Sequence, residues 1–301
     1  MQRTLARSVG LSGVGLHGGA PARLTLRPAP ADAGIVFCRI DVADRDQRVP
    51  ARWDRVSDTR LNTTISNAEG VSVSTIEHLM AALAASGVDN ALIDIDGPEI
   101  PIMDGSAAPF LRAIRSVGLA AQGAPRRAIR VLRPVSVRRG DATASLSPSD
   151  RFEIGFAIDF ADAAIGAQSG DLVVDGDSFA RELADCRTFG RLAEIEQLRR
   201  MGLALGGGLH NAIVVDGDRV LNPEGLRRSD EFVRHKMLDA VGDLALAGAP
   251  ILGRYEGARA GHEVTNLLLR ALFSDAAAWA WVDAPEACDD ASSDALRIAA
   301  E

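Results

Sequence analysis

Predicted strands and helices follow one another irregularly along this chain of 301 residues, and that order limits the fold more than any other feature. Alternating apolar residues predict strands, and apolar residues at helical spacing predict helices. The predicted strands cover residues 24–26, 35–37, 91–96, 129–132, 135–137, 144–146 and 152–160, with a hairpin at 212–221 around Asp216-Gly217-Asp218. The predicted helices cover residues 74–85, 110–117, 178–184, 193–200, 229–247 and about 263–273. Because strands and helices do not alternate regularly, an α+β fold is favoured over a doubly wound parallel sheet.

The sequence Gln122-Gly123-Ala124-Pro125 is the best candidate for a domain break. It predicts an N-terminal α+β domain over residues 1–124 and a C-terminal α+β domain over residues 127–283. Residues 284–301 hold five acidic residues and one basic residue, so an acidic, flexible tail is expected there.

Composition narrows the class of protein. Hydrophobic residues make up 47% of the chain and charged residues 25%, an ordinary profile for a soluble globular protein. The net charge of −8 gives no general attraction to nucleic acid, and no apolar run approaches the roughly 20 residues of a membrane span. The first residues lack the apolar core of a signal peptide, so a cytoplasmic protein is expected. Three widely spaced cysteines fit neither a disulfide framework nor a cysteine zinc site.

Six arginines between Arg126 and Arg139 depart from this acidic background. The simpler interpretation is a charged linker followed by the exposed face of a strand. The alternative is a patch that binds an anionic ligand.

The helix predicted at residues 229–247 carries the first set of chemically useful side chains. His235, Asp239 and Asp243 recur at every fourth position, so they share one face of the helix. An imidazole and a carboxylate one turn apart can bind the same Zn²⁺ ion, although such a pair is more often an exposed ion pair. The same helix contains Lys236, the only lysine among 33 basic residues.

Adjacent acid and imidazole side chains at Glu77 and His78 form the second set. Taken alone, Glu77 is explained as the third residue of a capping box that begins at Ser74, and His78 as a buried core residue. If His78 binds a metal instead, Glu77 lies beside it and can accept a proton from a water that the metal activates. His78, His235 and Asp239 would leave a fourth position open, as in catalytic zinc sites.

His262 follows Gly261 near a predicted helix start, where the helix dipole disfavours a protonated imidazole. Asp243 could offset that effect and keep His262 available as an acid near neutral pH. A surface-loop histidine is the alternative. The run Gly206-Gly207-Gly208 matches no phosphate-binding loop and is interpreted as a tight connection before the strand at 212–215.

Six motifs together resemble one family of enzymes, from about residue 2 to residue 282. The motifs are Gly13-Val14-Gly15-Leu16-His17-Gly18-Gly19, Ser74-Thr75-Ile76-Glu77-His78-Leu79-Met80-Ala81-Ala82-Leu83, Pro98-Glu99-Ile100-Pro101-Ile102-Met103-Asp104-Gly105-Ser106, Cys186-Arg187-Thr188-Phe189-Gly190, Asp230-Glu231-Phe232-Val233-Arg234-His235-Lys236-Met237-Leu238-Asp239 and Gly261-His262. The sequence is therefore similar to the UDP-3-O-acyl-N-acetylglucosamine deacetylases, the zinc amidases that commit Gram-negative bacteria to lipid A.

The resemblance implies a role for each matching residue. It implies that Zn²⁺ is held by His78, His235 and Asp239. It also implies that Glu77 is the general base, that His262 is the general acid oriented by Asp243, and that Thr188 helps to stabilise the oxyanion. The residues implied in substrate binding are Lys236, Phe189, Phe160 (stacked on uracil), His17 near the metal, and Leu192, Ile195, Leu198 and Leu203 of an insert that holds the acyl chain.

The reaction implied is removal of the N-acetyl group from a UDP-linked, 3-O-acylated N-acetylglucosamine, which gives acetate and a free amine. The implied partner is this small-molecule substrate, with no nucleic acid and no integral membrane segment, and a monomer is expected. The family fold implies two similar α+β domains, each a sheet with helices on one face. The helices are then sandwiched between the two sheets, with the site at the junction of the domains.

Two positions depart from the pattern of this family. Asp162 and Ala163 stand where many relatives have a His-Pro pair, which leaves the nucleotide contact there open. Asn62 stands where some relatives have a cysteine, so thiol chemistry near the metal is not expected. Two other functions stay open from the sequence. One is hydrolysis of another acylated amino sugar, and the other is a metal-stabilised binding protein whose arginines at 126–139 hold an anion.

Overall fold

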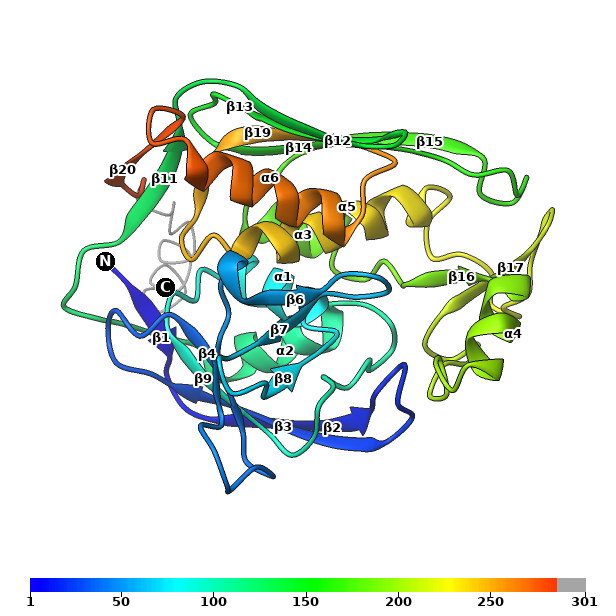
Figure 1. Cartoon of the computed structure of the whole chain (residues 1–301), viewed down its shortest axis with the longest axis horizontal. Coiled ribbons are helices and arrows are strands. Elements are labelled where there is room, and N and C mark those ends of the chain that lie inside the picture. The colour runs from blue at the N-terminus through cyan, green and yellow to red at the C-terminus, as the bar shows by residue number, and fades with distance from the viewer. Residues whose placement is uncertain (286–301) are drawn as a thin grey trace, which may run out of the picture.

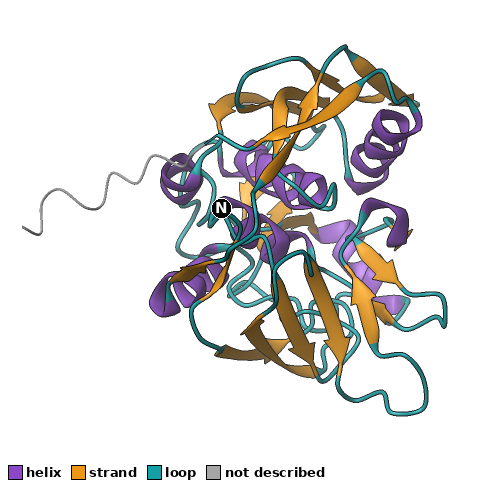
Figure 2. Cartoon of the chain, turned by 90° about the vertical axis from the view of Figure 1, so that its left-hand side faces the viewer, coloured by secondary structure: helices purple, strands orange, loops and turns teal. Residues whose placement is uncertain are grey.

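Helices fill the space between two β-sheets in the computed structural model, which describes residues 1–285 (Figure 1). Figure 2 shows the same layers from the side, with strands above and below the helices. The α+β fold predicted from the sequence, with helices sandwiched between two sheets, is therefore confirmed. Most of the acidic tail predicted at 284–301 lies outside the described residues.

A five-stranded sheet forms the layer at the bottom of Figure 1, in the order β2-β3-β9-β4-β5. Its strands are β2 (Val9–Val14), β3 (Pro21–Pro28), β4 (Ile35–Arg39), β5 (Arg48–Pro50) and β9 (Ala91–Ile95). β4 and β9 are parallel, and the other pairs are antiparallel. Alternate residues of β3 and β9, such as Leu24, Leu26 and Ile93, are buried, as expected when one face of a sheet is covered by helices. The helices of this half are α1 (Glu77–Ala85) and α2 (Ala108–Val117).

A seven-stranded sheet forms the opposite layer, and β19 is its central strand because β11, β13 and β14 all pair with it. The strands are β11 (Arg127–Val131), β12 (Val135–Arg139), β13 (Ala142–Ser147), β14 (Phe152–Asp159), β15 (Ala167–Val173), β19 (Ile251–Ala258) and β20 (Trp279–Asp283). Two long helices, α5 (Glu231–Ala245) and α6 (His262–Ser274), pack against this sheet.

Shorter elements complete the chain. They are β1 (Arg3–Leu5), which pairs with β10 (Leu119–Ala121); η1 (Trp53–Arg55); the sheet of β6 (Val56–Asp58), β7 (Thr64–Ser66) and β8 (Ser72–Val73); α3 (Gly176–Glu182); and an insert made of β16 (Phe189–Arg191), α4 (Leu192–Arg200), β17 (Ile213–Asp216) and β18 (Arg219–Val220). The predicted hairpin is confirmed, because β17 and β18 are antiparallel around Gly217, whose φ is +62°. Within residues 1–285, no helix has the length and apolar character needed to cross a membrane.

The middle layer explains why α5 is buried on almost every side. Twelve of its fifteen residues are buried, because α1 packs on one side and the seven-stranded sheet and α6 on the other. The polar face expected from the sequence therefore lies in the interior rather than in water. Four ionisable side chains of α5 are buried as a result, namely Glu231, His235, Asp239 and Asp243. Buried charges are costly unless they have partners, so each needs a specific neighbour.

The crossing of α1 and α5 depends on Gly242. A Cβ atom at this position would lie only 2.0 Å from the backbone oxygen of Glu77. The absence of a side chain therefore lets the backbones of the two helices come into contact. This contact brings Glu77 and His78 of α1 beside Asp239 and Asp243 of α5.

The predicted start of α1 at Ser74 is wrong. Ser74 forms a β-bridge with Glu99, and Thr75 has a φ of +58°, so neither residue is helical. The helix begins at Glu77, whose side chain accepts a hydrogen bond from the backbone of Thr63 instead of closing a capping box. Long-range strand pairing has overridden the local capping signal.

We expect Gly242→Ala to lower the free energy of unfolding by about 1–3 kcal/mol, since the new methyl group must push α1 and α5 apart. Thermal unfolding of the two proteins measures this difference. Gly97→Ala is the matched control, because a Cβ there would meet no atom within 4 Å. An unchanged unfolding midpoint in Gly242→Ala would show that the helices can separate without cost.

Candidate active site

Three side chains from α1 and α5 converge in the middle layer. His78, His235 and Asp239 are all buried, and each offers one atom to a group that lies within 4.8 Å. The Asp239 Oδ1 atom is 3.4 Å from His78 Nε2 and 3.3 Å from His235 Nε2. The two imidazole rings meet edge to face, with centroids 5.0 Å apart. The residues that the sequence predicted as metal ligands therefore lie together.

The chemistry of this group fits a divalent metal ion. His235 Nδ1 lies 3.1 Å from the Cys186 carbonyl oxygen, so Nδ1 carries the proton and Nε2 presents its lone pair to the group. Burial lowers the pKa of His235 to about 3, which excludes an ordinary ion pair with Asp239 at neutral pH. Asp239 Oδ1 has no hydrogen-bond partner among residues 1–285. Ligand atoms of a tetrahedral zinc site, with bonds of about 2.1 Å, lie about 3.4 Å apart, close to the spacing observed.

Lys236 holds the other oxygen of Asp239. Its Nζ donates to Asp239 Oδ2 at 2.9 Å and lies 5.5 Å from the centre of the Phe189 ring. Burial opposes the charge on Asp239, but the pKa of Asp239 lies well below its usual range, since the Lys236 ammonium that bonds Oδ2 favours the carboxylate. Asp239 is therefore ionised, with Oδ1 left free toward the two imidazoles.

Glu77 and His262 lie next to the metal-binding group, the name used here for His78, His235 and Asp239, which could hold a metal ion. His262 is the first residue of α6, and its Nδ1 is 2.8 Å from Asp243 Oδ2. Its Nε2 atom is 4.0 Å from Glu77 Oε1. Burial alone would lower the pKa of His262, but the Asp243 carboxylate outweighs burial and raises it to about 9. Burial also raises the pKa of Glu77.

Thr63 is a site residue that the sequence reasoning missed. Its backbone N–H donates to Glu77 Oε2 at 3.0 Å, and its hydroxyl donates to Asp243 Oδ1 at 2.5 Å. Thr63 lies in a loop before β7, 14 residues from Glu77 and 180 from Asp243. No local pattern signals a contact over such a separation.

Thr188, which was predicted as a site residue, lies just before β16. Backbone hydrogen bonds on two sides hold it in place. The Thr188 N–H donates to the Gly105 carbonyl at 2.8 Å, and the Thr188 carbonyl accepts from Ile213. The preceding Arg187 is buried and forms an ion pair with Glu231 at 2.9 Å in the first turn of α5. Arg187 and Glu231 belong to motifs quoted above, but no spacing pattern predicts a contact between them. The pair holds the Cys186 carbonyl where it meets His235.

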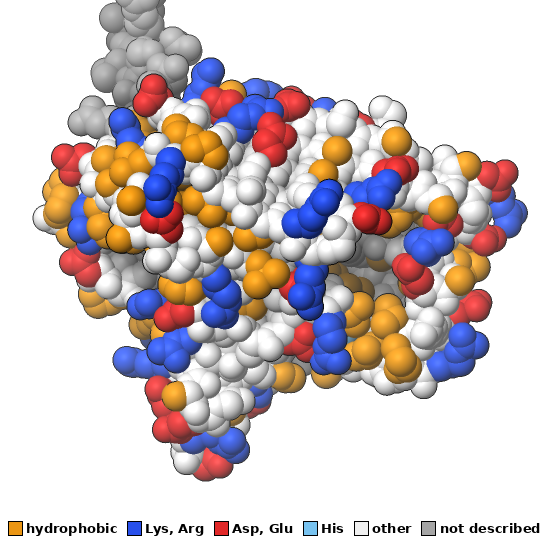
Figure 3. Space-filling model, turned by 45° about the horizontal axis from the view of Figure 1, so that its top comes forward, with side chains coloured by type: hydrophobic (Ala, Val, Ile, Leu, Met, Phe, Trp, Pro, Cys, Tyr) orange, Lys and Arg blue, Asp and Glu red, His pale blue; other side chains and the backbone are white. Residues whose placement is uncertain are grey.

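The insert brings together most of the residues predicted to bind substrate. Phe160 and Phe189 pack edge to face at 5.7 Å, and Phe189 also packs on Phe232. Leu192, Ile195 and Leu203 are half-buried on α4 and the loop that follows it. The same insert exposes Met201, Leu205 and Leu209. Figure 3 shows apolar side chains beside a hollow on the side of the molecule where Figure 1 places this insert.

His17 lies in the loop between β2 and β3, which is held from two sides. Glu99 accepts the backbone N–H groups of His17 and Gly18 at 2.8 Å, and Leu205 of the insert donates its N–H to the His17 carbonyl. Gly206 allows this approach, since a Cβ there would lie 2.1 Å from the Gly15 oxygen. The glycine run is therefore a close contact between chain segments, in keeping with the tight connection predicted. Burial lowers the pKa of His17.

Asp162 and Asn62, the residues that depart from the family pattern, both form specific polar contacts. Asp162 forms an ion pair with Arg191 at 2.5 Å, which ties the β14–β15 turn to the start of α4. Asn62 Oδ1 accepts hydrogen bonds from the Thr64 hydroxyl at 2.9 Å and from the Thr75 N–H at 3.3 Å. Neither residue is among the three of the metal-binding group.

The arginines between Arg126 and Arg139 do not form an unpaired patch. Four of them pair with acids: Arg126 with Asp89, Arg130 with Asp150, Arg133 with Asp275 and Arg139 with Glu263. Lys, Arg, Asp and Glu side chains are interspersed on the face seen in Figure 3. These pairs agree with the simpler interpretation from the sequence, a charged linker followed by the exposed face of a strand.

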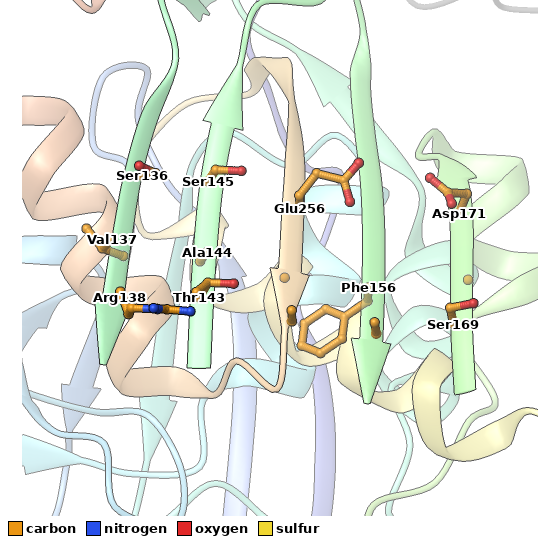
Figure 4. Close-up of a pocket in the computed structure, with 14 residues that line it drawn as sticks. Ser136, Val137, Arg138, Thr143, Ala144, Ser145, Phe156, Ser169, Asp171 and Glu256 are labelled. Atoms are coloured by element: carbon orange, nitrogen blue, oxygen red, sulfur yellow. The ribbon is translucent and has the colours of Figure 1, made fainter. Parts of the chain in front are cut away.

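A hollow on the seven-stranded sheet is separate from the metal-binding group. Its lining comes from β12, β13, β14, β15 and β19, with Ser136, Ser145, Ser169 and Glu256 among its polar residues (Figure 4). None of the residues that line it belongs to α1, α5 or α6. The residues predicted to bind the metal and to act as base and acid therefore do not line this hollow.

Known proteins are similar to this chain over most of its length. A sequence model of the LpxC family, the UDP-3-O-acyl N-acetylglycosamine deacetylases, matches residues 2–274. The chain belongs to this family. Among curated members of the LpxC family, the UDP-3-O-acyl-N-acetylglucosamine deacetylase of Phenylobacterium zucineum is 56% identical over 92% of this chain and 95% of its own length. Those of Myxococcus xanthus and Neisseria gonorrhoeae are 52% and 44% identical, covering 91% and 96% of this chain and 87% and 95% of their own lengths.

Proposed function

We propose that this protein removes the N-acetyl group from UDP-3-O-(3-hydroxyacyl)-N-acetylglucosamine with the help of Zn²⁺, the committed step of lipid A biosynthesis. The observation that carries the proposal is a buried acid–base pair, Glu77 and His262, beside the group formed by His78, His235 and Asp239. The membership of the chain in a deacetylase family supports the substrate class.

His78, His235 and Asp239 would hold the metal ion. Zinc in such a site supplies a Lewis acid for the amide carbonyl and makes water a stronger acid. Lys236 would keep Asp239 ionised and turned toward the metal, through its hydrogen bond to Oδ2.

Glu77 would act as the general base. One of its oxygens accepts the Thr63 amide, which leaves Oε1 on the side of His262 Nε2. Burial raises the pKa of Glu77, which makes its carboxylate a better proton acceptor than an exposed one.

His262 would act as the general acid. Asp243 accepts its Nδ1 proton, so Nε2 carries the proton that can pass to the departing amine. The raised pKa of His262 keeps that proton in place at neutral pH. Thr188 would add a hydrogen bond to the oxyanion.

The remaining roles follow the resemblance. Lys236 and Phe189 would position the substrate, His17 would lie near the metal, and Phe160 would stack on uracil. Leu192, Ile195 and Leu203 would line the path of the acyl chain. The proposal also includes a cytoplasmic monomer with a domain break between residues 124 and 127.

Glu77→Gln tests the base directly. We expect kcat to fall by about 10²- to 10⁴-fold because the amide cannot accept the proton, while the protein still binds one equivalent of zinc. Acetate release and metal analysis of the same preparation give both values. Unimpaired turnover in this variant would remove Glu77 from its proposed role.

Asp243→Asn tests the acid through the pH dependence of kcat/KM. His262 must be protonated to act, so activity should decline as the pH rises through its pKa, which is about 9. Loss of the Asp243 charge lowers that pKa, and the alkaline limb should therefore move to lower pH. An alkaline limb at the same pH as in the wild type would contradict the assignment.

A further inference from the structure

All three polar groups of Thr63 form hydrogen bonds in or beside the candidate active site. Its N–H donates to Glu77 Oε2, and its hydroxyl donates to Asp243 Oδ1. Its carbonyl oxygen accepts the N–H of Ile76, the residue before α1, at 3.4 Å. The side chain is buried, with 2% of the residue exposed. Water therefore does not compete for these bonds.

Each of these bonds selects one oxygen of a carboxylate. With Oε2 of Glu77 held by the amide, Oε1 is the oxygen that lies 4.0 Å from His262 Nε2. With Oδ1 of Asp243 held by the hydroxyl, Oδ2 is the oxygen bonded to His262 Nδ1. One residue thus connects the base to the group that orients the acid.

The chemistry of threonine suits this position. Glu77 and Asp243 are buried carboxylates, and the charge on Asp243 disfavours the charge on Glu77. A lysine or arginine between them would form ion pairs with both and weaken Glu77 as a base. The amide and hydroxyl of Thr63 supply donors without adding a charge, so both carboxylates keep their orientation and Glu77 loses less of its basicity than it would beside a cation.

We propose that Thr63 is a positioning residue for the deacetylation, because it fixes the reactive oxygen of Glu77 and the orientation of the Asp243–His262 pair. This inference depends on the proposed function, in which Glu77 and His262 are the base and the acid. Thr63 itself touches neither the metal-binding group nor the reacting atoms in this account.

Three variants separate positioning from packing. Thr63→Val keeps the shape and the backbone amide but removes the hydroxyl donor. Thr63→Ser restores the donor without the methyl group. Thr64→Val is the matched control, since it removes a neighbouring hydroxyl that bonds Asn62 and not the acid–base pair.

For Thr63→Val we expect kcat for acetate release from UDP-3-O-acyl-N-acetylglucosamine to fall about 10- to 100-fold, the range for a lost hydrogen bond to a charged group. KM should stay within about threefold, because the change affects the reacting groups and not the binding surface. Zinc content and the unfolding midpoint should match the wild type. Thr63→Ser should recover kcat to within about threefold, and Thr64→Val should behave as the wild type.

Three results would overturn the proposal: an unchanged kcat in Thr63→Val, a Thr63→Ser variant as slow as Thr63→Val, or a loss of kcat accompanied by loss of zinc or of stability. A second measurement does not need the substrate. In ¹H–¹⁵N spectra, the Nδ1–H proton of His262 should exchange with water about tenfold faster in Thr63→Val, because Asp243 is no longer held in place. Unchanged exchange would also count against Thr63. A wild-type protein that releases no acetate would contradict the proposed function, and the exchange comparison would still test Thr63.

Discussion

The backbone contact between α1 and α5 at Gly242 is the constraint on which the rest of the site depends. Glu77 meets Gly242 at a distance that no side chain would permit. Consequently one turn of α1 supplies a carboxyl group and an imidazole, and two turns of α5 supply an imidazole and two carboxyl groups, all within the same buried layer. The two sheets enclose this layer from either side. The fold thus places polar chemistry where a globular protein usually places only apolar side chains.

Burial on this scale explains the ion pairs and hydrogen bonds around the site. Asp239 accepts a hydrogen bond from Lys236, and Asp243 is hydrogen-bonded to His262 and Thr63. Glu231 forms an ion pair with Arg187. The bond to Lys236 leaves Oδ1 of Asp239 free toward the two imidazoles, whereas both oxygens of Asp243 and both oxygens of Glu231 are bonded. Orientation and charge are therefore set by the same contacts, which is what a preorganised catalytic site requires.

Much of this organisation could be predicted from the sequence, and the limits have physical causes. Helical spacing placed His235, Asp239 and Asp243 on one face of a helix, and the adjacent Glu77 and His78 belong to one turn. The capping box at Ser74 was a local signal that strand pairing with Glu99 overrides. The capping box that does form, at Asp175 and Ser178, was missed. Thr63 and the Arg187–Glu231 pair could not be predicted, since contacts between residues far apart in sequence leave no spacing pattern.

Titration of the metal-free protein with Zn²⁺, with acetate release from UDP-3-O-(3-hydroxyacyl)-N-acetylglucosamine as the readout, tests whether His78, His235 and Asp239 form a catalytic zinc site. The stripped protein should be inactive, and its activity should rise with added zinc and level off at one equivalent. Equal activity in the stripped protein, or binding of one equivalent of zinc without acetate release, would contradict this assignment.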